Sequence, residues 1–228
     1  MAYSINVILN LFYPPLCLHC QVLLPKRQML FCSARKEILS LIHPQGHCRT
    51  CFAEFDHGKC ERCMKRTVVI HRQLAACEPI GPAKALLNGI DCGKQECIPA
   101  AASLMAYQWL EYKMPLPDLL IPLPSSFWKK QKIGFNPHRM LAEEIGKIFS
   151  VPVRSILHRK FDRASFLTQG QFRWSIQCLK KEKLCDSNIL LIASSLDDTL
   201  FRSVGKELRL FFPAHIGALA FASSFHEK

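Results

Sequence analysis

Two pairs of closely spaced cysteines carry the strongest chemical signal in the chain. Cys48 and Cys51 form one Cys-x2-Cys pair, and Cys60 and Cys63 form the second pair after a short spacer. Each pair directs two thiolates toward one point, so two pairs can complete a tetrahedron of sulfur ligands around Zn²⁺. Disulfides or buried free thiols are the alternative. The spacing is the one that zinc ribbons use, so we predict a structural zinc site.

A second group of cysteines precedes this quartet and lacks a fourth member. Cys17, Cys20 and Cys32 belong to it, and the residue three positions after Cys32 is Arg35, which cannot ligate a metal. Imidazole serves zinc well, and three histidines of the segment are candidates: His19, His43 and His47. Three interpretations stay open: a zinc site closed by histidine, a site shared with the quartet, or cysteines that only pack.

The composition indicates a basic globular protein. Hydrophobic residues make up 49% of the 228 residues, and 30 Lys and Arg against 18 Asp and Glu give a formal net charge of +12. Such a charge favours anionic partners, namely nucleic acid, phosphorylated small molecules or an acidic membrane surface. The chain shows no secretory signal and no apolar run long enough to span a membrane. We therefore expect a cytoplasmic protein whose cysteines are reduced or hold metal.

The order of apolar runs and prolines predicts two parts. We expect a short helix in residues 1–13 and then metal-stapled irregular structure to residue 66, because that segment has too little apolar sequence for a core of its own. Beyond it, strands are predicted at 67–80, 118–123, 151–158, 188–193 and 215–222, and helices at 83–112 (interrupted near 88–93), 138–149 and 200–212. Residues 125–136 are expected to form a basic loop and residues 160–185 a polar excursion. Alternating helices and apolar strands predict an α/β domain over 67–228, with a mostly parallel sheet covered by helices on both faces.

The segment after the strand at 188–193 is a candidate phosphate site. A strand, a loop and a helix N-terminus present free backbone N–H groups to an anion in many α/β proteins. This loop carries hydroxyls and adjacent carboxylates without any glycine: Ser194, Ser195, Asp197, Asp198 and Thr199. The carboxylates would repel a phosphate unless a metal ion or an arginine lay between them. Asp198 or Thr199 can equally be a plain helix cap, and we favour that interpretation.

A basic loop is the second candidate for anion binding. Aromatic residues flank its three lysines: Lys129, Lys130 and Lys132. This combination suits a nucleic-acid backbone with base stacking, and it also suits pyrophosphate. Arg159 and Arg163 follow in the segment at 158–173, and both basic segments would form one anion-binding face if they lay at the same end of the sheet. A solvated lysine loop is the alternative. We identify no nucleophile–base pair, and GxSxG, HExxH and Walker motifs are absent from the sequence.

Taken in order, these parts resemble the ComF/GntX family of phosphoribosyltransferase-like proteins. The matching stretches are Cys17 to Cys63, Leu120 to Pro124, Ile133 to Pro137 with the helix at 138–149, and Asn188 to Leu200. The resemblance implies a zinc-ribbon-like module in residues 1–66 followed by a phosphoribosyltransferase-like domain. It also implies an association with DNA uptake, as a cytoplasmic component that meets incoming single-stranded DNA.

The departures from the family pattern concern the substrate loop. In type I phosphoribosyltransferases an acidic pair and a Thr-Thr-Gly loop hold the ribose hydroxyls and the 5-phosphate of phosphoribosyl pyrophosphate. Here the acidic pair falls on Ala193 and Ser194, and the Thr-Thr-Gly positions fall on residues 197–199. The family's loop arginine and glutamine are Ile133 and Pro137. These changes argue against tight phosphoribosyl pyrophosphate binding in the usual mode.

Three functional hypotheses follow from the sequence. The leading one is a ComF-like accessory protein that binds single-stranded DNA through its basic segments and works with proteins of the competence machinery. The first alternative is an active Mg²⁺-dependent phosphoribosyltransferase at the 193–200 loop, with a phosphorylated small molecule as substrate. The second alternative is a scaffold that binds a protein partner. Zinc is the expected cofactor in all three, and magnesium only in the enzyme.

Overall fold

The chain is represented by a computed structural model that describes residues 14–26, 28–43, 45–54, 60–65, 67–125, 131–161, 174–178 and 184–223. The helix expected in residues 1–13 lies outside the described residues. Among the described residues, no helix has the length and apolar character needed to cross a membrane.

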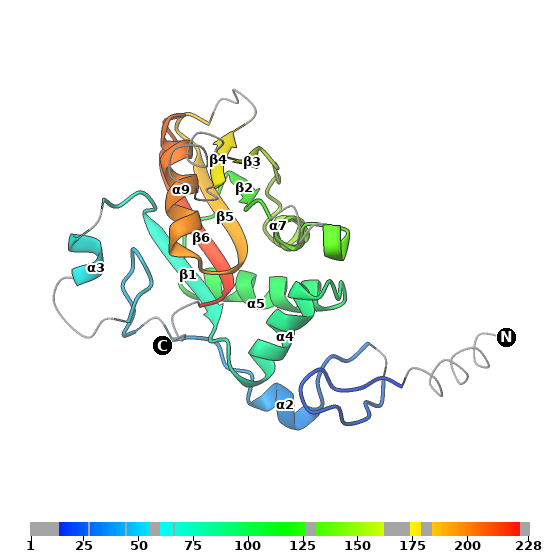
Figure 1. The fold of residues 1–228 in the computed structure, drawn as a ribbon. Coiled ribbons are helices and arrows are strands. Elements are labelled where there is room, and N and C mark those ends of the chain that lie inside the picture. The colour runs from blue at the N-terminus through cyan, green and yellow to red at the C-terminus, as the bar shows by residue number, and fades with distance from the viewer. Residues whose placement is uncertain are drawn as a thin grey trace, which may run out of the picture.

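A four-stranded parallel sheet forms the centre of the fold (Figure 1). Its strands lie in the order β1-β6-β5-β2, with bounds Arg72–Cys77 (β1), His215–Ala222 (β6), Asn188–Ser195 (β5) and Leu119–Pro122 (β2). All three pairings are parallel. Most side chains of these strands are buried on both faces, as expected where helices cover both sides of a parallel sheet. The predicted α/β architecture with a mostly parallel sheet is confirmed.

Helices cover the two faces of this sheet. One face packs against α4 (Gly81–Asp91), α5 (Cys97–Glu111) and α7 (Pro137–Phe149), and α9 (Asp198–Arg209) lies on the other (Figure 1). Successive side chains of β1 point to opposite faces of the sheet. Arg72 lines a pocket with Trp109 of α5, and Gln73 lines another with Arg202 of α9. The break between α4 and α5 follows the interruption that the sequence predicts, and α9 ends three residues earlier than the predicted helix at 200–212.

The expected strand at 151–158 is only partly present. Val153 makes a single parallel bridge to Leu120, at the outer edge of β2, and regular pairing does not begin until Leu157. The chain passes close to α7 here, since a Cβ on Gly146 would lie 2.8 Å from the Val151 carbonyl oxygen. The absence of a side chain at Gly146 therefore lets the 151–154 segment lie against the helix while it extends the sheet edge.

A two-stranded antiparallel hairpin occupies the region expected to be a polar excursion. It consists of β3 (Leu157–Phe161) and β4 (Trp174–Cys178). The backbone N–H of Cys178 donates to the Glu207 carboxylate of α9 at 3.2 Å, which ties the hairpin to that helix. The sequence predicts an excursion here but not its two strands, because neither has a continuous apolar run.

The N-terminal segment packs onto the α/β part rather than standing apart from it. It contains two short helices, α2 (Ser33–Glu37) and α3 (Glu61–Met64). Leu24, Phe31, Ile42 and Phe52 are buried in the same apolar cluster as the sheet. The backbone of Ile42 also donates to the Ala76 carbonyl of β1 at 2.9 Å. The domain boundary at residue 66 stays a prediction, but the apolar residues of the N-terminal segment and of the sheet form one shared core.

Candidate metal centres and the carboxyl edge of the sheet

The four cysteines of the quartet converge on one point. Their Sγ atoms all lie within 4.8 Å of one another, with Cys48 and Cys63 separated by 3.7 Å and Cys51 and Cys60 by 3.6 Å. A tetrahedral zinc ion with Zn–S bonds of about 2.3 Å would hold its sulfur atoms about 3.8 Å apart. A disulfide would bring two of them to about 2.05 Å. The quartet therefore has the geometry of a metal site, as the spacing predicts.

Local backbone structure positions these four thiols. Phe52 donates to the Cys48 carbonyl at 2.8 Å and has a left-handed φ of 56°, which closes the first turn. The second turn leads directly into α3, for which Cys60 is the N-cap. Burial raises the pKa of Cys60, but the Cys63 N–H and the neighbouring thiols outweigh it and lower that pKa to about 7. Burial raises the pKa of Cys51 to about 11, and burial with the neighbouring thiols raises that of Cys63, so metal binding must displace the protons of these two thiols.

Cys17, Cys20 and Cys32 form a second group of the same kind. Their Sγ atoms lie within 4.8 Å of one another, and Cys20 and Cys32 are 3.8 Å apart. Burial raises the pKa of Cys17, but hydrogen bonds from the N–H groups of Cys20, Cys32 and His19 dominate and lower it to about 6. These three thiols can therefore hold a metal ion, although they leave one tetrahedral position without a protein ligand.

No histidine or carboxylate completes this second group among the described residues. His43 accepts a hydrogen bond from the Gln45 N–H at 3.4 Å, and His47 stacks on Phe52 with ring centroids 4.6 Å apart. The two groups are also separate, because the segment around Cys17 lies near α2 and α4 whereas α3 lies beside β1 (Figure 1). Neither the histidine-closed site nor the shared site is seen. Arg35, in the first turn after Cys32, occupies the position of the missing ligand in the Cys-x2-Cys pattern.

We predict that Arg35→Cys will raise the affinity of the three-cysteine group for zinc, because a fourth thiolate completes the tetrahedron. Cobalt substitution of the purified protein measures this, since a tetrathiolate site has a distinct absorption spectrum. Arg35→Ser is the matched control, because it removes the arginine without adding a thiolate. An equal metal affinity of the two variants would show that position 35 cannot reach the ion.

A buried histidine connects the carboxyl ends of β2 and β5. His138 of α7 is 8% exposed, and its Nδ1 lies 3.0 Å from the Leu123 carbonyl oxygen. Because a carbonyl only accepts, Nδ1 carries the proton, and Nε2 then accepts from the Ser194 hydroxyl at 3.2 Å. Ser194 is 3% exposed. Its hydroxyl is thus committed to the interior, where it joins β5 to α7.

Asn136 is the second link at this edge. Its side-chain oxygen accepts from the Ser125 hydroxyl at 2.6 Å and from the His138 N–H at 3.0 Å, so it caps the start of α7. Its side-chain nitrogen donates to the Leu123 carbonyl at 3.3 Å. The Gly-Phe-Asn stretch that carries part of the family resemblance therefore fastens α7 to the end of β2.

The loop between β5 and α9 is short and largely closed. Ser195 is the last residue of β5, Leu196 is 1% exposed, and the Asp197 carboxylate accepts from the Leu200 N–H at 3.0 Å. A helix cap is present, but it is Asp197 and not the expected Asp198 or Thr199. Asp198 and Thr199 are the first two residues of α9. One N–H group at this helix start, that of Leu200, is therefore bonded to the protein's own carboxylate.

One of the predicted basic residues lies at the same edge. Arg159 of β3 donates through Nε to the Pro124 carbonyl at 3.1 Å. Burial lowers its pKa, and the charge of Asp197 opposes that effect, which places the guanidinium and this carboxylate in one neighbourhood. Lys132 is exposed in a helical turn at residues 131–133. Lys129, Lys130 and Arg163 lie outside the described residues.

Sequence reasoning missed the residues that organise this edge. His138, Asn136 and Ser125 were not predicted as site residues. A histidine after an Asn-Pro helix start has no periodic signature, and only the closure of α7 onto β2 and β5 brings it to Ser194. The one available signal was that Asn136 precedes proline at the beginning of an amphipathic segment, which indicates an N-cap.

No protein-family model matches the chain, and no curated protein is similar to it. Solved structures superpose on part of it. A purine phosphoribosyltransferase from Pyrococcus horikoshii is 18% identical with a TM-score of 0.39, and the match covers 55% of this chain and 72% of that one. A hypothetical protein from Neisseria gonorrhoeae with bound ppGpp is 14% identical with a TM-score of 0.37, covering 58% and 74%. Hypoxanthine phosphoribosyltransferase from Trypanosoma cruzi is 14% identical with a TM-score of 0.32, covering 58% and 66%. Such distant likeness carries no argument about activity.

Proposed function

We propose that this protein is a ComF/GntX-like accessory protein that binds single-stranded nucleic acid and does not transfer phosphoribosyl groups. The observation that supports this most directly is the Asp197 carboxylate at the start of α9, bonded to the Leu200 N–H at 3.0 Å. In the usual substrate mode, N–H groups of that kind hold a phosphate. A carboxylate in their place satisfies them and repels a second anion.

The neighbouring side chains support the same proposal. The Ser194 hydroxyl is directed to His138 rather than to solvent, and Leu196 fills the loop with buried apolar surface. A ribose-binding carboxylate pair is absent from positions 193 and 194. Thr199 stays exposed, but the lack of ribose-binding carboxylates and the acidic cap at Asp197 argue against Mg²⁺-dependent transfer at this edge.

Nucleic acid is the anionic partner that the charge distribution favours. The formal net charge is +12, and Arg159 lies at the carboxyl edge with Lys132 exposed in the preceding segment. Three lysines flanked by aromatic residues at 127–135 suit contacts to phosphates and stacking on bases. In this proposal the quartet Cys48, Cys51, Cys60 and Cys63 holds a structural Zn²⁺, which fixes the N-terminal segment against the domain.

Fluorescence anisotropy with a labelled single-stranded oligonucleotide tests the proposal. If three to five phosphates are neutralised, affinity should fall about 20- to 130-fold between 50 and 200 mM salt, because each neutralised phosphate contributes a slope of about 0.7 for single strands. Replacing Lys129, Lys130 and Lys132 with glutamine should weaken binding to every sequence. A matched triple variant at exposed positions 84, 94 and 113 loses the same charge elsewhere and should bind nearly as wild type. A flat salt response, or equal losses in the two variants, would count against the proposal.

Calorimetric titration with phosphoribosyl pyrophosphate and Mg²⁺ tests the excluded activity. We expect no binding heat from the zinc-replete protein. Micromolar binding that Asp197→Asn strengthens would instead show that the loop still accepts a phosphate, and the protein would then be assigned to phosphoribosyl transfer.

A further inference from the structure

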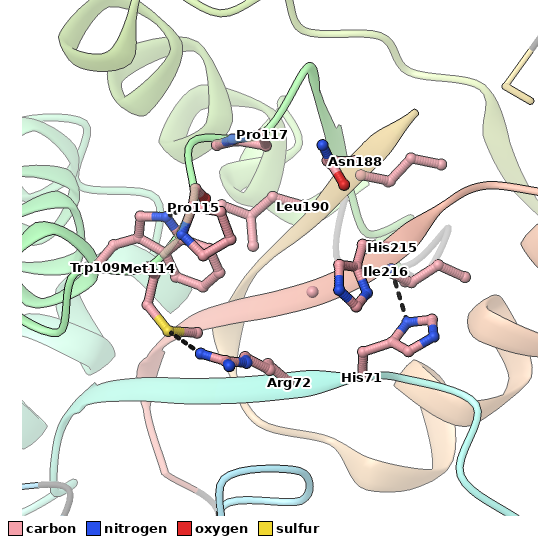
Figure 2. Close-up of a pocket in the computed structure, with 12 residues that line it drawn as sticks. His71, Arg72, Trp109, Met114, Pro115, Pro117, Asn188, Leu190, His215 and Ile216 are labelled. Carbon is pink, nitrogen blue, oxygen red and sulfur yellow. Dashed lines mark hydrogen bonds between the residues drawn. The ribbon is translucent and has the colours of Figure 1, made fainter. Parts of the chain in front are cut away.

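A second pocket lies at the opposite end of the sheet, where its strands begin. The strand register places Arg72 of β1 beside Gly217 of β6, and Gly217 beside Leu190 of β5. Asn188 and His215 pair two residues earlier, on the same face. These residues form a floor, and Trp109, Met114 and Pro115 form a wall above it (Figure 2). The pocket thus lies on the face of the sheet that α5 covers, at the starts of β1, β5 and β6.

Trp109 and Leu190 pack closely on the backbone of Gly217 at the floor of this pocket. A Cβ at this position would lie 3.2 Å from the Trp109 ring and 3.3 Å from Leu190 Cδ1, so any side chain would push these two residues into the pocket. Trp109 is 3% exposed and its Nε1 donates to the Pro115 carbonyl at 3.1 Å, which fixes the ring as a rigid wall. The cavity measures about 80 Å³. A cavity of about 150 Å³ encloses a whole benzene molecule. This smaller cavity can therefore hold only one edge of a planar ring, and the rest of the ring would lie at its open mouth.

Arg72 and His71 are two of the polar groups around this apolar space, and both can donate to an anion. Arg72 is exposed, and its guanidinium donates to Met114 Sδ at 3.3 Å, which is a weak acceptor (Figure 2). His71 Nδ1 accepts from the Ile216 N–H at 3.0 Å, so a neutral His71 carries its proton on Nε2. Neither aspartate nor glutamate is among the described residues that line the pocket. Within the part of the chain that the structure describes, the partner of this guanidinium is a thioether, and a guanidinium so placed beside an apolar slot is suited to a carboxylate attached to a flat ring.

We propose that this amino-edge pocket binds a small aromatic or heteroaromatic monocarboxylate. The ring enters the cavity beside Trp109 and Pro115, and the carboxylate replaces Met114 Sδ as the partner of Arg72. Met114 is flexible enough to move aside and widen the mouth. The pocket is separate from the carboxyl edge of the sheet, so this proposal stands or fails independently of nucleic-acid binding.

The test uses benzoate as the probe and the full zinc-replete chain, followed by two-dimensional amide and indole NMR. We expect saturable shifts of the Trp109 indole and the Gly217 amide with a Kd of about 1 mM, which is reasonable for a fragment of this size. Benzamide, the neutral isostere, should bind about tenfold more weakly because it cannot form the charge-assisted pair with Arg72.

Two variants locate the probe. Arg72→Gln should weaken benzoate about tenfold and leave benzamide unchanged, while Gly217→Ala should abolish saturable binding of both. Arg139→Gln, an exposed arginine on α7, is the charge-matched control and should bind as wild type. Benzoate binding that survives Arg72→Gln unchanged, shifts that map away from Trp109, or no saturation by 20-fold excess over the expected Kd of about 1 mM would each overturn the proposal. Because Arg72 is an exposed side chain, its variant keeps the test valid even if Gly217→Ala disturbs folding.

Discussion

If the quartet holds Zn²⁺ as proposed, replacing Cys51 with serine is expected to release that ion and to loosen residues 45–65 around it. Cys51 is 7% exposed and lies 3.6 Å from Cys60, so its loss removes one corner of the tetrahedron from inside the fold. In small zinc modules the binding of structural Zn²⁺ contributes roughly 10 to 16 kcal/mol to the free energy of folding. A site with three remaining ligands should keep only a small part of that contribution. Zinc content by mass spectrometry, together with limited proteolysis of residues 45–65, measures the effect.

Cys92→Ser is the matched control for this experiment. Cys92 is exposed and belongs to neither metal group, so its replacement should leave both zinc content and protease resistance at wild-type levels. Wild-type protein treated with a strong chelator should reproduce the proteolysis pattern of Cys51→Ser. If Cys51→Ser kept its zinc and its resistance, the quartet would not be a four-thiolate site.

Part of the fold could be predicted because the relevant signals are local. The strand His215–Ala222 agrees with the predicted range, and α7 begins one residue from its predicted start, since Asn136 and Pro137 mark the helix boundary. The quartet could be predicted for the same reason: two short turns fix the direction of four thiols before any tertiary contact forms. In each case a few neighbouring residues determine the structure.

The remaining features depend on contacts between distant segments. The β3–β4 hairpin has polar strands, and its partner on α9 is Glu207, which no sequence pattern connects to Cys178. Likewise, the missing ligand at Arg35 could be read from the sequence, but the separation of the two cysteine groups could not. The two groups are separate because the N-terminal segment packs near α4 at one end and leads into β1 at the other (Figure 1).

The helix that borders the carboxyl edge also allows a stability prediction. Phe201 is fully buried in the first turn of α9, and its N–H donates to the Asp197 carbonyl at 2.9 Å. Phe201→Ala removes most of a large side chain from a packed interior and should cost about 3 to 5 kcal/mol. For a chain of this size the thermal midpoint should fall by on the order of 10 °C, measured by circular dichroism.

Phe212→Ala is the matched control for Phe201→Ala, because Phe212 lies just after the same helix and is 77% exposed. Its replacement should change the free energy of unfolding by no more than about 0.5 kcal/mol. Phe201 contributes to the fold through burial, whereas the anion-repelling group at this edge is the Asp197 carboxylate. Phe201→Ala should therefore lower stability without creating affinity for phosphoribosyl pyrophosphate, and Asp197→Asn tests that affinity separately. Binding gained by Phe201→Ala alone would mean that packing of α9, rather than the charge of its cap, keeps the phosphate out.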